Sequence, residues 1–233
     1  MQKILIIFLI IMLYVILNSL FKIACYNFWN GKPSQENYSF ILNKLDNNSK
    51  ILDVGVGTGY NLVQNKEIIK NKNLIIHGID IDKDYNKYCK NLIKDNGLDL
   101  NIFIELKDLF KINYKYDYII FGQSFPVIER NLMTRMLNHA IENLKDDGKI
   151  IFIHSLVDDY KDIDNIFYKI KPYIKYIPFI WLDSGKKTTK FEFENWLENN
   201  NLRYNYYITR YDKFFNMKIN TYAYICSPII YIK

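Results

Sequence analysis

Ile51-Leu-Asp-Val-Gly-Val-Gly-Thr-Gly59 is the stretch from which the architecture of the whole chain can be predicted. Its first four residues predict a short buried strand, in which Asp53 is the one charged side chain. Gly55, Gly57 and Gly59 then alternate with other residues, and glycine lets a backbone turn sharply and approach a ligand closely because it lacks a Cβ atom. Apolar residues within 60–71 predict a helix after this turn. A strand, a glycine turn and a helix N-terminus together predict a nucleotide site at the carboxyl edge of a sheet.

A second predicted strand, Leu74–Asp80, ends in a carboxylate 25 residues after Gly55. An aspartate in this place can accept hydrogen bonds from both hydroxyl groups of a ribose. Asp82 is a competitor, but it precedes the predicted helix 83–94 and is therefore a natural N-cap. We predict that Asp80 is the ribose ligand.

The rest of the chain continues to alternate helices with strands, which predicts an α/β fold. Three further helices are expected over 33–45, 129–144 and from Thr189 to Leu197. Further strands are expected over 100–105, 116–121, 149–154, 203–209 and 219–226, with a turn at 145–148. His154 would end the 149–154 strand at the same sheet edge as the glycine turn, where a general base could act; a structural histidine is the alternative.

The glycine pattern is not that of a dinucleotide site, because G-x-G-x-x-G begun at Gly55 needs glycine where Tyr60 stands. Acidic-x-G-x-G-x-G, beginning at Asp53, resembles motif I of the class I S-adenosylmethionine (SAM)-dependent methyltransferases. Leu144-Lys-x-x-Gly148-Lys-Ile150 resembles the family's turn into its fifth strand. The resemblance covers roughly residues 33–226. It implies a doubly wound, mostly parallel sheet of seven strands in the order 3-2-1-4-5-7-6, with helices on both faces.

The resemblance also implies SAM as cofactor, no metal, and a set of cofactor-binding residues. The set comprises Asp53, Gly55, Gly57, Thr58, Gly59, Asp80, Asp108, Gly122 and Gln123. Asp108 would bind the adenine amino group, unless it is simply a loop aspartate in solvent. Gly122-Gln-Ser-Phe-Pro126 occupies the motif IV position but lacks the Asp/Asn-Pro-Pro-Tyr/Phe pattern of the amino-methylating DNA and glutamine enzymes. This departure argues against those substrates and leaves the acceptor atom open.

The N-terminus predicts a membrane anchor over residues 1–31, followed by a catalytic domain over 32–233. No charge occurs from residue 4 to residue 21, and a helix of that length would be roughly 27 Å long, close to the thickness of a bilayer core. Tyr26, Phe28 and Trp29 follow as an interfacial aromatic belt would. Flanking lysines favour a cytosolic catalytic domain. A cleaved signal peptide and a buried core helix are the alternatives.

Composition limits the possible partners. The net charge of +6 is divided between residues 1–32, which carry three lysines and no acid, and the other 201 residues, which have 28 basic and 25 acidic side chains. The catalytic domain is thus only mildly basic, and a nucleic-acid partner is not expected. Three cysteines without a C-x-x-C pair indicate reduced thiols, and scattered histidines indicate no metal site.

The segment 166–182 is rich in aromatic residues and contains three lysines, two prolines and no acid. It predicts either a buried cover over the sheet or a lid that faces a membrane.

The favoured function is a membrane-anchored SAM-dependent methyltransferase that acts on a small or lipid-like acceptor. The alternatives are a protein or RNA methyltransferase, and a non-catalytic SAM-binding membrane scaffold.

Overall fold

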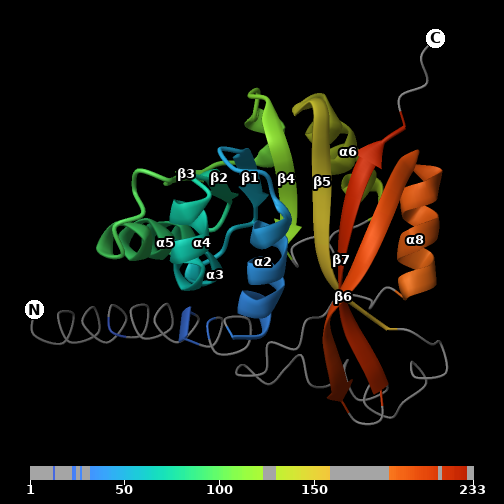
Figure 1. Cartoon of the computed structure of the whole chain (residues 1–233), viewed down its shortest axis with the longest axis horizontal. Helices are drawn as coiled ribbons and strands as arrows, with labels where there is room; N and C mark the ends of the chain where they lie inside the picture. The colour runs from blue at the N-terminus through green and yellow to red at the C-terminus, as the bar shows by residue number, and fades with distance from the viewer. Residues whose placement is uncertain are drawn as a thin grey trace, which may run out of the picture.

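Strands and helices alternate along the chain, as the sequence predicts (Figure 1). The computed structural model describes Leu13, Ile23, Ala24, Asn27 and residues 32–122, 130–157, 189–214 and 217–229. The strands are β1 (Lys50–Val54), β2 (Ile75–Asp80), β3 (Ile102–Leu106), β4 (Tyr116–Gly122), β5 (Leu144–Val157), β6 (Leu202–Phe214) and β7 (Met217–Pro228). The helices are α2 (Lys32–Lys44), α3 (Tyr60–Gln64), α4 (Lys66–Asn71), α5 (Lys83–Asp95), α6 (Arg130–Glu142) and α8 (Lys190–Asn199), with a 3-10 turn η2 (Leu109–Lys111).

The seven strands form one sheet in the order β3-β2-β1-β4-β5-β7-β6, which confirms the predicted topology. Neighbours from β3 to β5 are parallel. Strand β7 is antiparallel to both β5 and β6, so it lies inside the sheet although it comes last in the chain. The order reverses between β1 and β4, and open α/β sheets bind ligands at the carboxyl side of such a switch point.

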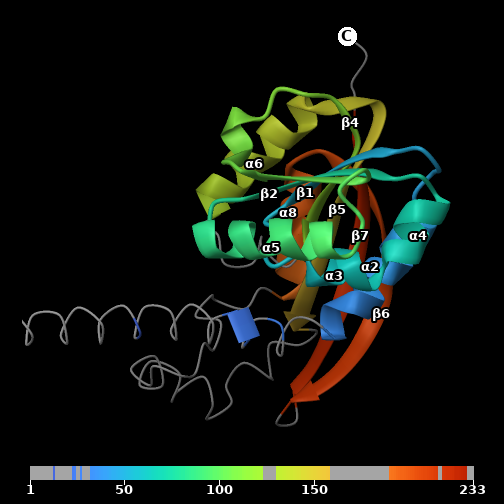
Figure 2. The ribbon, with the colours of Figure 1, turned by 90° about the vertical axis from the view of Figure 1, so that its left-hand side faces the viewer.

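Helices cover both faces of the sheet, as expected for a doubly wound fold. On one face, α2, α3, α4 and α5 pack against Ile51 and Ile120; on the other, α6 and α8 pack against Leu52 and Ile119. Figure 2 shows α5 and α6 on opposite sides of the strands. Because both faces are covered, the central strands read as nearly continuous apolar sequence, and Asp53 in β1 stands out as a buried exception.

The single helix predicted over 60–71 is wrong, because the structure divides it into α3 and α4 at Asn65. The Asn65 backbone has φ −108° and ψ 21°, outside helical geometry. Its side-chain amide donates a hydrogen bond of 2.8 Å to the Asn61 carbonyl oxygen. A short polar side chain that binds the local backbone in this way competes with regular helix geometry.

The predicted turn at 145–148 is also wrong, because these residues lie within β5. Tyr116 pairs with Leu144 and Tyr118 with Lys149, so residues 145–148 of β5 stand opposite the single residue Asp117 of β4. The bulge is held by an ion pair of 2.7 Å between Lys145 and Asp117. The turn-forming residues at 145–148 thus produce a β-bulge within the strand instead of ending it.

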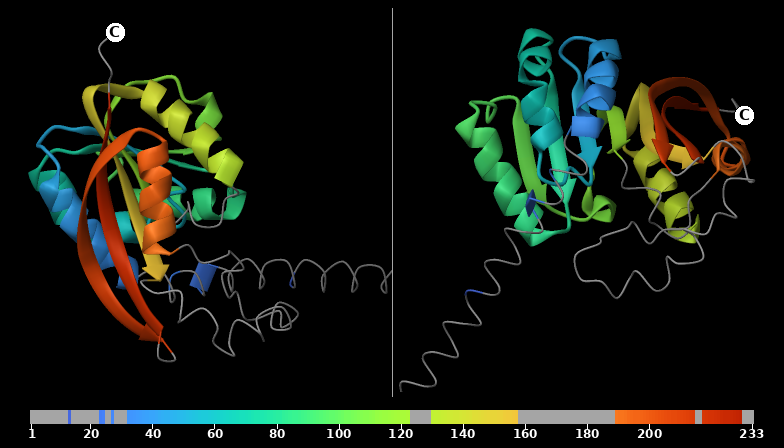
Figure 3. Two further views of the ribbon diagram at one scale, coloured as in Figure 1. Left: turned by 90° about the vertical axis from the view of Figure 1, so that its right-hand side faces the viewer. Right: turned by 90° about the horizontal axis from the view of Figure 1, so that it is seen from below.

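Strands β5, β6 and β7 are longer than the sequence predicts. Figure 3 shows β6 and β7 extending past the ends of α2 and α8. The end of β5, Val157, pairs with Ile219 close to the β6–β7 hairpin. The extension therefore lies at the carboxyl edge of the sheet, on the same side as the glycine turn.

Two predicted features fall outside the described residues. The predicted anchor at 4–21 lies there apart from Leu13, and the aromatic segment 166–182 lies there entirely. Within the part of the chain that the structure describes, no helix is long and apolar enough to cross a membrane.

Candidate functional site

The glycine turn connects β1 to α3 and adopts a left-handed backbone at each of its three glycines. The φ angles of Gly55, Gly57 and Gly59 are 74°, 59° and 70°. Residues with a Cβ atom are strained in this region, so the pattern of glycines is a requirement of the backbone itself. A Cβ atom at Gly59 would also lie 2.3 Å from Cys89 Sγ in α5. The turn is therefore closely packed against α5, the helix that follows β2.

Asp80, at the end of β2, fixes the middle of the glycine turn. Its Oδ2 atom accepts a hydrogen bond of 2.9 Å from the Gly57 N–H, and its Oδ1 atom accepts one of 2.8 Å from the Asp82 N–H. Burial raises the pKa of Asp80, against the effect of these hydrogen bonds. Each carboxylate oxygen has a second acceptor position, so the group can hold the turn and accept further bonds from a ligand.

Asp82 has the capping role predicted for it. Its side chain accepts hydrogen bonds from the backbone N–H groups of Asp84 and Tyr85, 2.9 Å and 3.1 Å long, at the start of α5. The two aspartates thus have different contacts within the protein: Asp80 faces the turn, and Asp82 caps a helix. Binding of a ribose by Asp80 stays a prediction.

A second carboxylate, Asp53, is buried beneath the turn with an exposed fraction of 1%. The Tyr38 hydroxyl, from α2, lies 3.1 Å and 3.2 Å from its two carboxylate oxygens and donates to them. Burial raises the pKa of Asp53 to about 7; the Tyr38 hydrogen bond lowers it, and the negative charge of Asp80 raises it further. A positively charged ligand group would relieve the repulsion between the two carboxylates.

Gly122, at the end of β4, brings that strand close to the same tyrosine. A Cβ atom on Gly122 would lie 2.3 Å from the Tyr38 hydroxyl oxygen. Asp53, Gly122 and Tyr38 therefore meet at the point where β1 and β4 diverge. Tyr38 lies within the helix predicted over 33–45, and the sequence carries no signal for its contact with Asp53. Gln123 lies outside the described residues.

Thr58 lies within the glycine turn but is 1% exposed. Its hydroxyl donates a hydrogen bond of 2.6 Å to Oδ1 of Asn27, which precedes α2 in the chain. The hydroxyl is thus occupied within the protein, and contact with a cofactor would fall to the Thr58 backbone. Nothing in the sequence marked Asn27 as part of the site.

Asp108 and His154 have different surroundings from those of the turn. Asp108 is exposed after β3 and caps η2 by accepting a hydrogen bond of 3.0 Å from the Phe110 N–H.

His154 lies within β5, three residues before its end, and packs against the rings of Phe152 and Phe193. Burial lowers the pKa of His154 to about 3, so its ring is neutral at pH 7 and weakly basic. The predicted adenine and general-base roles stay predictions.

An apolar side chain that sequence analysis overlooked stands beside Asp80. Ile81 is 77% exposed directly after β2. An exposed isoleucine next to the carboxylate that is predicted to bind a ribose offers a surface on which a planar base could pack. Among the residues that the structure describes, no group of three or more His, Cys, Asp or Glu side chains could hold a metal ion.

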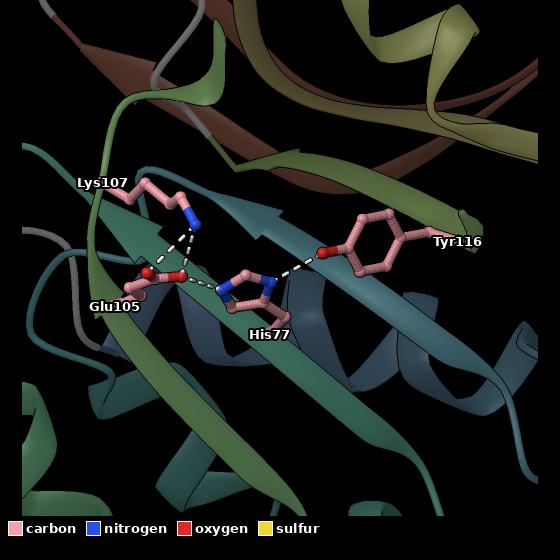
Figure 4. A network of polar contacts seen from close by, with 4 residues as sticks. All are labelled: His77, Glu105, Lys107 and Tyr116. Atoms are coloured by element: carbon pink, nitrogen blue, oxygen red, sulfur yellow. Dashed lines mark hydrogen bonds and ion pairs between the residues drawn. The ribbon is translucent and has the colours of Figure 1, made fainter. Parts of the chain in front are cut away.

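A separate polar network lies on the sheet face that carries α6 (Figure 4). His77 Nδ1 lies 2.6 Å from the Tyr116 hydroxyl, and His77 Nε2 lies 3.1 Å from a carboxylate oxygen of Glu105, which also binds Lys107. Burial lowers the pKa of His77 and raises that of Tyr116 to about 12. We therefore assign a neutral imidazole that accepts from Tyr116 and donates to Glu105. These contacts join β2, β3 and β4 and belong to the framework.

Three solved structures illustrate the fold. A geranyl diphosphate C-methyltransferase from Streptomyces coelicolor A3(2), with S-adenosyl-L-homocysteine, is 8% identical with a TM-score of 0.62; the match covers 84% of this chain and 78% of that one. Magnesium protoporphyrin IX methyltransferase from Synechocystis PCC 6803, with bound SAH, is 12% identical with a TM-score of 0.58 and 82% coverage of each chain. Mitomycin 7-O-methyltransferase is 16% identical with a TM-score of 0.57, covering 82% of this chain and 54% of that one, so the chain spans about half of this relative.

These identities are low and establish the shared fold only. None of the curated protein sequences matches the chain. The sequence does match a family model described as a methyltransferase domain, over residues 45–201. That range is more than half of the chain and includes the glycine turn, Asp80 and β5. The chain therefore belongs to the methyltransferase domain family.

Proposed function

We propose that the protein is a membrane-anchored, SAM-dependent methyltransferase whose acceptor is a small or lipid-like molecule. The observation that carries the cofactor assignment is the arrangement around the glycine turn. Asp80 holds the Gly57 amide. A second carboxylate, the buried Asp53, lies close enough for the charge of Asp80 to raise its pKa. In a nucleoside-linked amino acid, the nucleoside would meet Asp80 and the amino acid would meet Asp53.

The residues fit SAM group by group. Asp80 would accept hydrogen bonds from the ribose hydroxyls, the exposed Ile81 would pack on the purine, and Asp108 would accept from the adenine amino group. Asp53 lies at the junction of β1 and β4, where the ammonium and sulfonium groups would be held. One buried carboxylate, Asp53, and one partly buried carboxylate, Asp80, suit a ligand with two cationic groups. The pyrophosphate of a dinucleotide would instead place two negative charges beside them.

When bound, SAM supplies a methyl group that its sulfonium charge has already activated. The protein's own residues then need to orient donor and acceptor in line and keep water out. Gly122 lets Tyr38 pack against the end of β4, and the extended strands β5, β6 and β7 flank that edge. A base would help an amine or hydroxyl acceptor. His154 is the residue predicted for that role, but its burial and its lowered pKa favour the alternative, a structural histidine. A thiol or acidic phenol would need no base.

A small acceptor agrees with the names of the structural relatives, whose printed substrates are small molecules. A lipid-like acceptor agrees with the charge-free run at 4–21, which would hold the catalytic domain at a membrane surface, on the cytosolic side. A protein or RNA acceptor is the alternative. The mild charge of residues 33–233 does not favour RNA.

Purified full-length protein is expected to bind SAM and its demethylated product, and not NAD. The reason is the match between the carboxylates of Asp53 and Asp80 and a cationic ligand. Isothermal titration calorimetry with the three compounds measures this directly. Incubation with methyl-labelled SAM and separate lipid, small-molecule, protein and RNA fractions then identifies the acceptor. Binding of NAD without binding of SAM would refute the assignment, and label in RNA alone would favour the alternative.

Membrane anchoring is tested independently of the cofactor. Full-length protein is expected to stay with membranes after an alkaline carbonate wash, because the charge-free run is long enough for a span. A variant that lacks residues 1–26 keeps Asn27 and is expected in the soluble fraction. Release of the full-length protein, or a mature N-terminus beyond Leu20, would refute the anchor and indicate peripheral attachment or signal cleavage.

A further inference from the structure

Asn27 contacts the glycine turn from a part of the chain that lies outside the α/β framework. Its Oδ1 atom accepts a hydrogen bond of 2.6 Å from the Thr58 hydroxyl, 31 residues away. Its Nδ2 atom lies 3.5 Å from the Tyr88 hydroxyl of α5. The first distance is that of a strong bond and the second is long for a hydrogen bond, so the contact with Thr58 is the principal one.

The turn is held at three consecutive residues. Gly57 is held by Asp80, and Gly59 is packed against Cys89. Both of these supports come from neighbouring βα elements, β2 and α5. Thr58, by contrast, is held by Asn27, which precedes α2 in the chain. Because Thr58 is 1% exposed, loss of its acceptor would leave a buried hydroxyl unsatisfied, which is more costly than the loss of an exposed bond.

We propose that Asn27 is a positioning residue for the cofactor turn, so that cofactor affinity depends on the attachment of the segment that carries Asn27. This proposal rests on the proposed function, because it takes the turn to be the cofactor site. Asn27 is six residues from Phe21, the end of the charge-free run. Six extended residues span at most about 20 Å. The proposed anchor would thus end within that distance of Asn27. Movement at the membrane would then reach the turn mainly through the hydrogen bond between Asn27 and Thr58.

The test uses full-length protein and S-adenosyl-L-homocysteine as the probe, with affinity measured by calorimetry. Asn27→Ala is expected to weaken binding about five- to tenfold, as is Thr58→Val, which removes the hydroxyl but keeps the shape. The double variant is expected to be no weaker than the single ones, because both remove the same bond. Thr58→Ser keeps the hydroxyl and is expected to weaken binding less than Thr58→Val does, which separates loss of the hydrogen bond from loss of the methyl group.

Asn43→Ala is the matched control. Asn43 donates a hydrogen bond of 2.9 Å to the Ser39 carbonyl oxygen on the exposed side of α2, away from the turn. This variant is expected to leave the affinity unchanged. A second readout needs no ligand: amide hydrogen exchange of a peptide that spans 55–60 is expected to quicken in Asn27→Ala and to be unchanged in Asn43→Ala.

The outcomes separate the two proposals. If the unaltered protein fails to bind the probe, the proposed function fails. If it binds, and Asn27→Ala lowers the melting temperature without changing the affinity or the exchange at 55–60, the role of Asn27 is structural only and the inference is overturned. Additive losses in the double variant would also overturn it, because the two side chains would then act separately.

Discussion

Replacing Gly59 with alanine is expected to lower the free energy of unfolding by about 2–5 kcal/mol and to abolish measurable cofactor binding. A left-handed backbone costs a residue with a Cβ atom about 1–2 kcal/mol, and Gly59 has φ 70°. The new Cβ atom would lie 2.3 Å from Cys89 Sγ, and forcing extra atoms into a packed site costs a further 1–3 kcal/mol, roughly. Urea denaturation of the ligand-free protein measures the sum.

Gly97 provides the matched control for this experiment. Its φ of 63° is also left-handed, but nothing lies within 4 Å of an added Cβ atom. Gly97→Ala should therefore show the backbone cost alone, about 1–2 kcal/mol. The double variant Gly59→Ala/Cys89→Ala removes the Sγ atom and should recover most of the difference. Equal losses in Gly59→Ala and Gly97→Ala would show that contact with Cys89 is unimportant.

Asp80→Ala is expected to weaken binding of SAM and of S-adenosyl-L-homocysteine by about 1.5–3 kcal/mol, the range for a hydrogen bond to a charged group. That is roughly 10- to 150-fold in the dissociation constant. The substitution removes the acceptor for the ribose and the partner of the Gly57 N–H, so the turn loses its shape as the ligand loses its contact. Calorimetry at a fixed pH and salt concentration measures the loss.

Asp82→Ala distinguishes ligand binding from local stability. It removes the cap of α5 and should cost about 1 kcal/mol in the free energy of unfolding. Its affinity for cofactor should stay within about twofold of the unaltered protein, since the side chain faces the helix. If Asp82→Ala weakened binding as much as Asp80→Ala does, the assignment of the ribose ligand would be wrong.

The fold was predictable because its signals are local. A run such as Ile51–Val54 between polar residues indicates a buried strand wherever the chain places it. The left-handed turn was predictable because three glycines satisfy a backbone requirement that few other residues meet. The order of the strands could not be derived from these patterns and came from the resemblance to a family.

The parts of the site that escaped prediction depend on contacts between distant segments. Tyr38 reads as an ordinary apolar-face residue of α2 until the sheet places Asp53 opposite its hydroxyl. Asn27 has no neighbouring motif, and its contact with Thr58 exists only once the segment before α2 reaches the turn. The division of the 60–71 helix at Asn65 is a subtler failure, because asparagine is tolerated within helices and here binds the backbone instead.

The interior position of β7 has a consequence for how the chain is made. The ribosome delivers β5 and β6 before β7, yet β7 pairs with both of them. Until residues 217–228 have emerged, β5 has an open edge where its final partner will lie, and an open edge readily pairs with other chains. A chain that is inserted in a membrane by its first residues would carry this open edge at the bilayer surface throughout the rest of translation. The nascent protein is therefore most exposed to misassembly in the interval between synthesis of β6 and synthesis of β7.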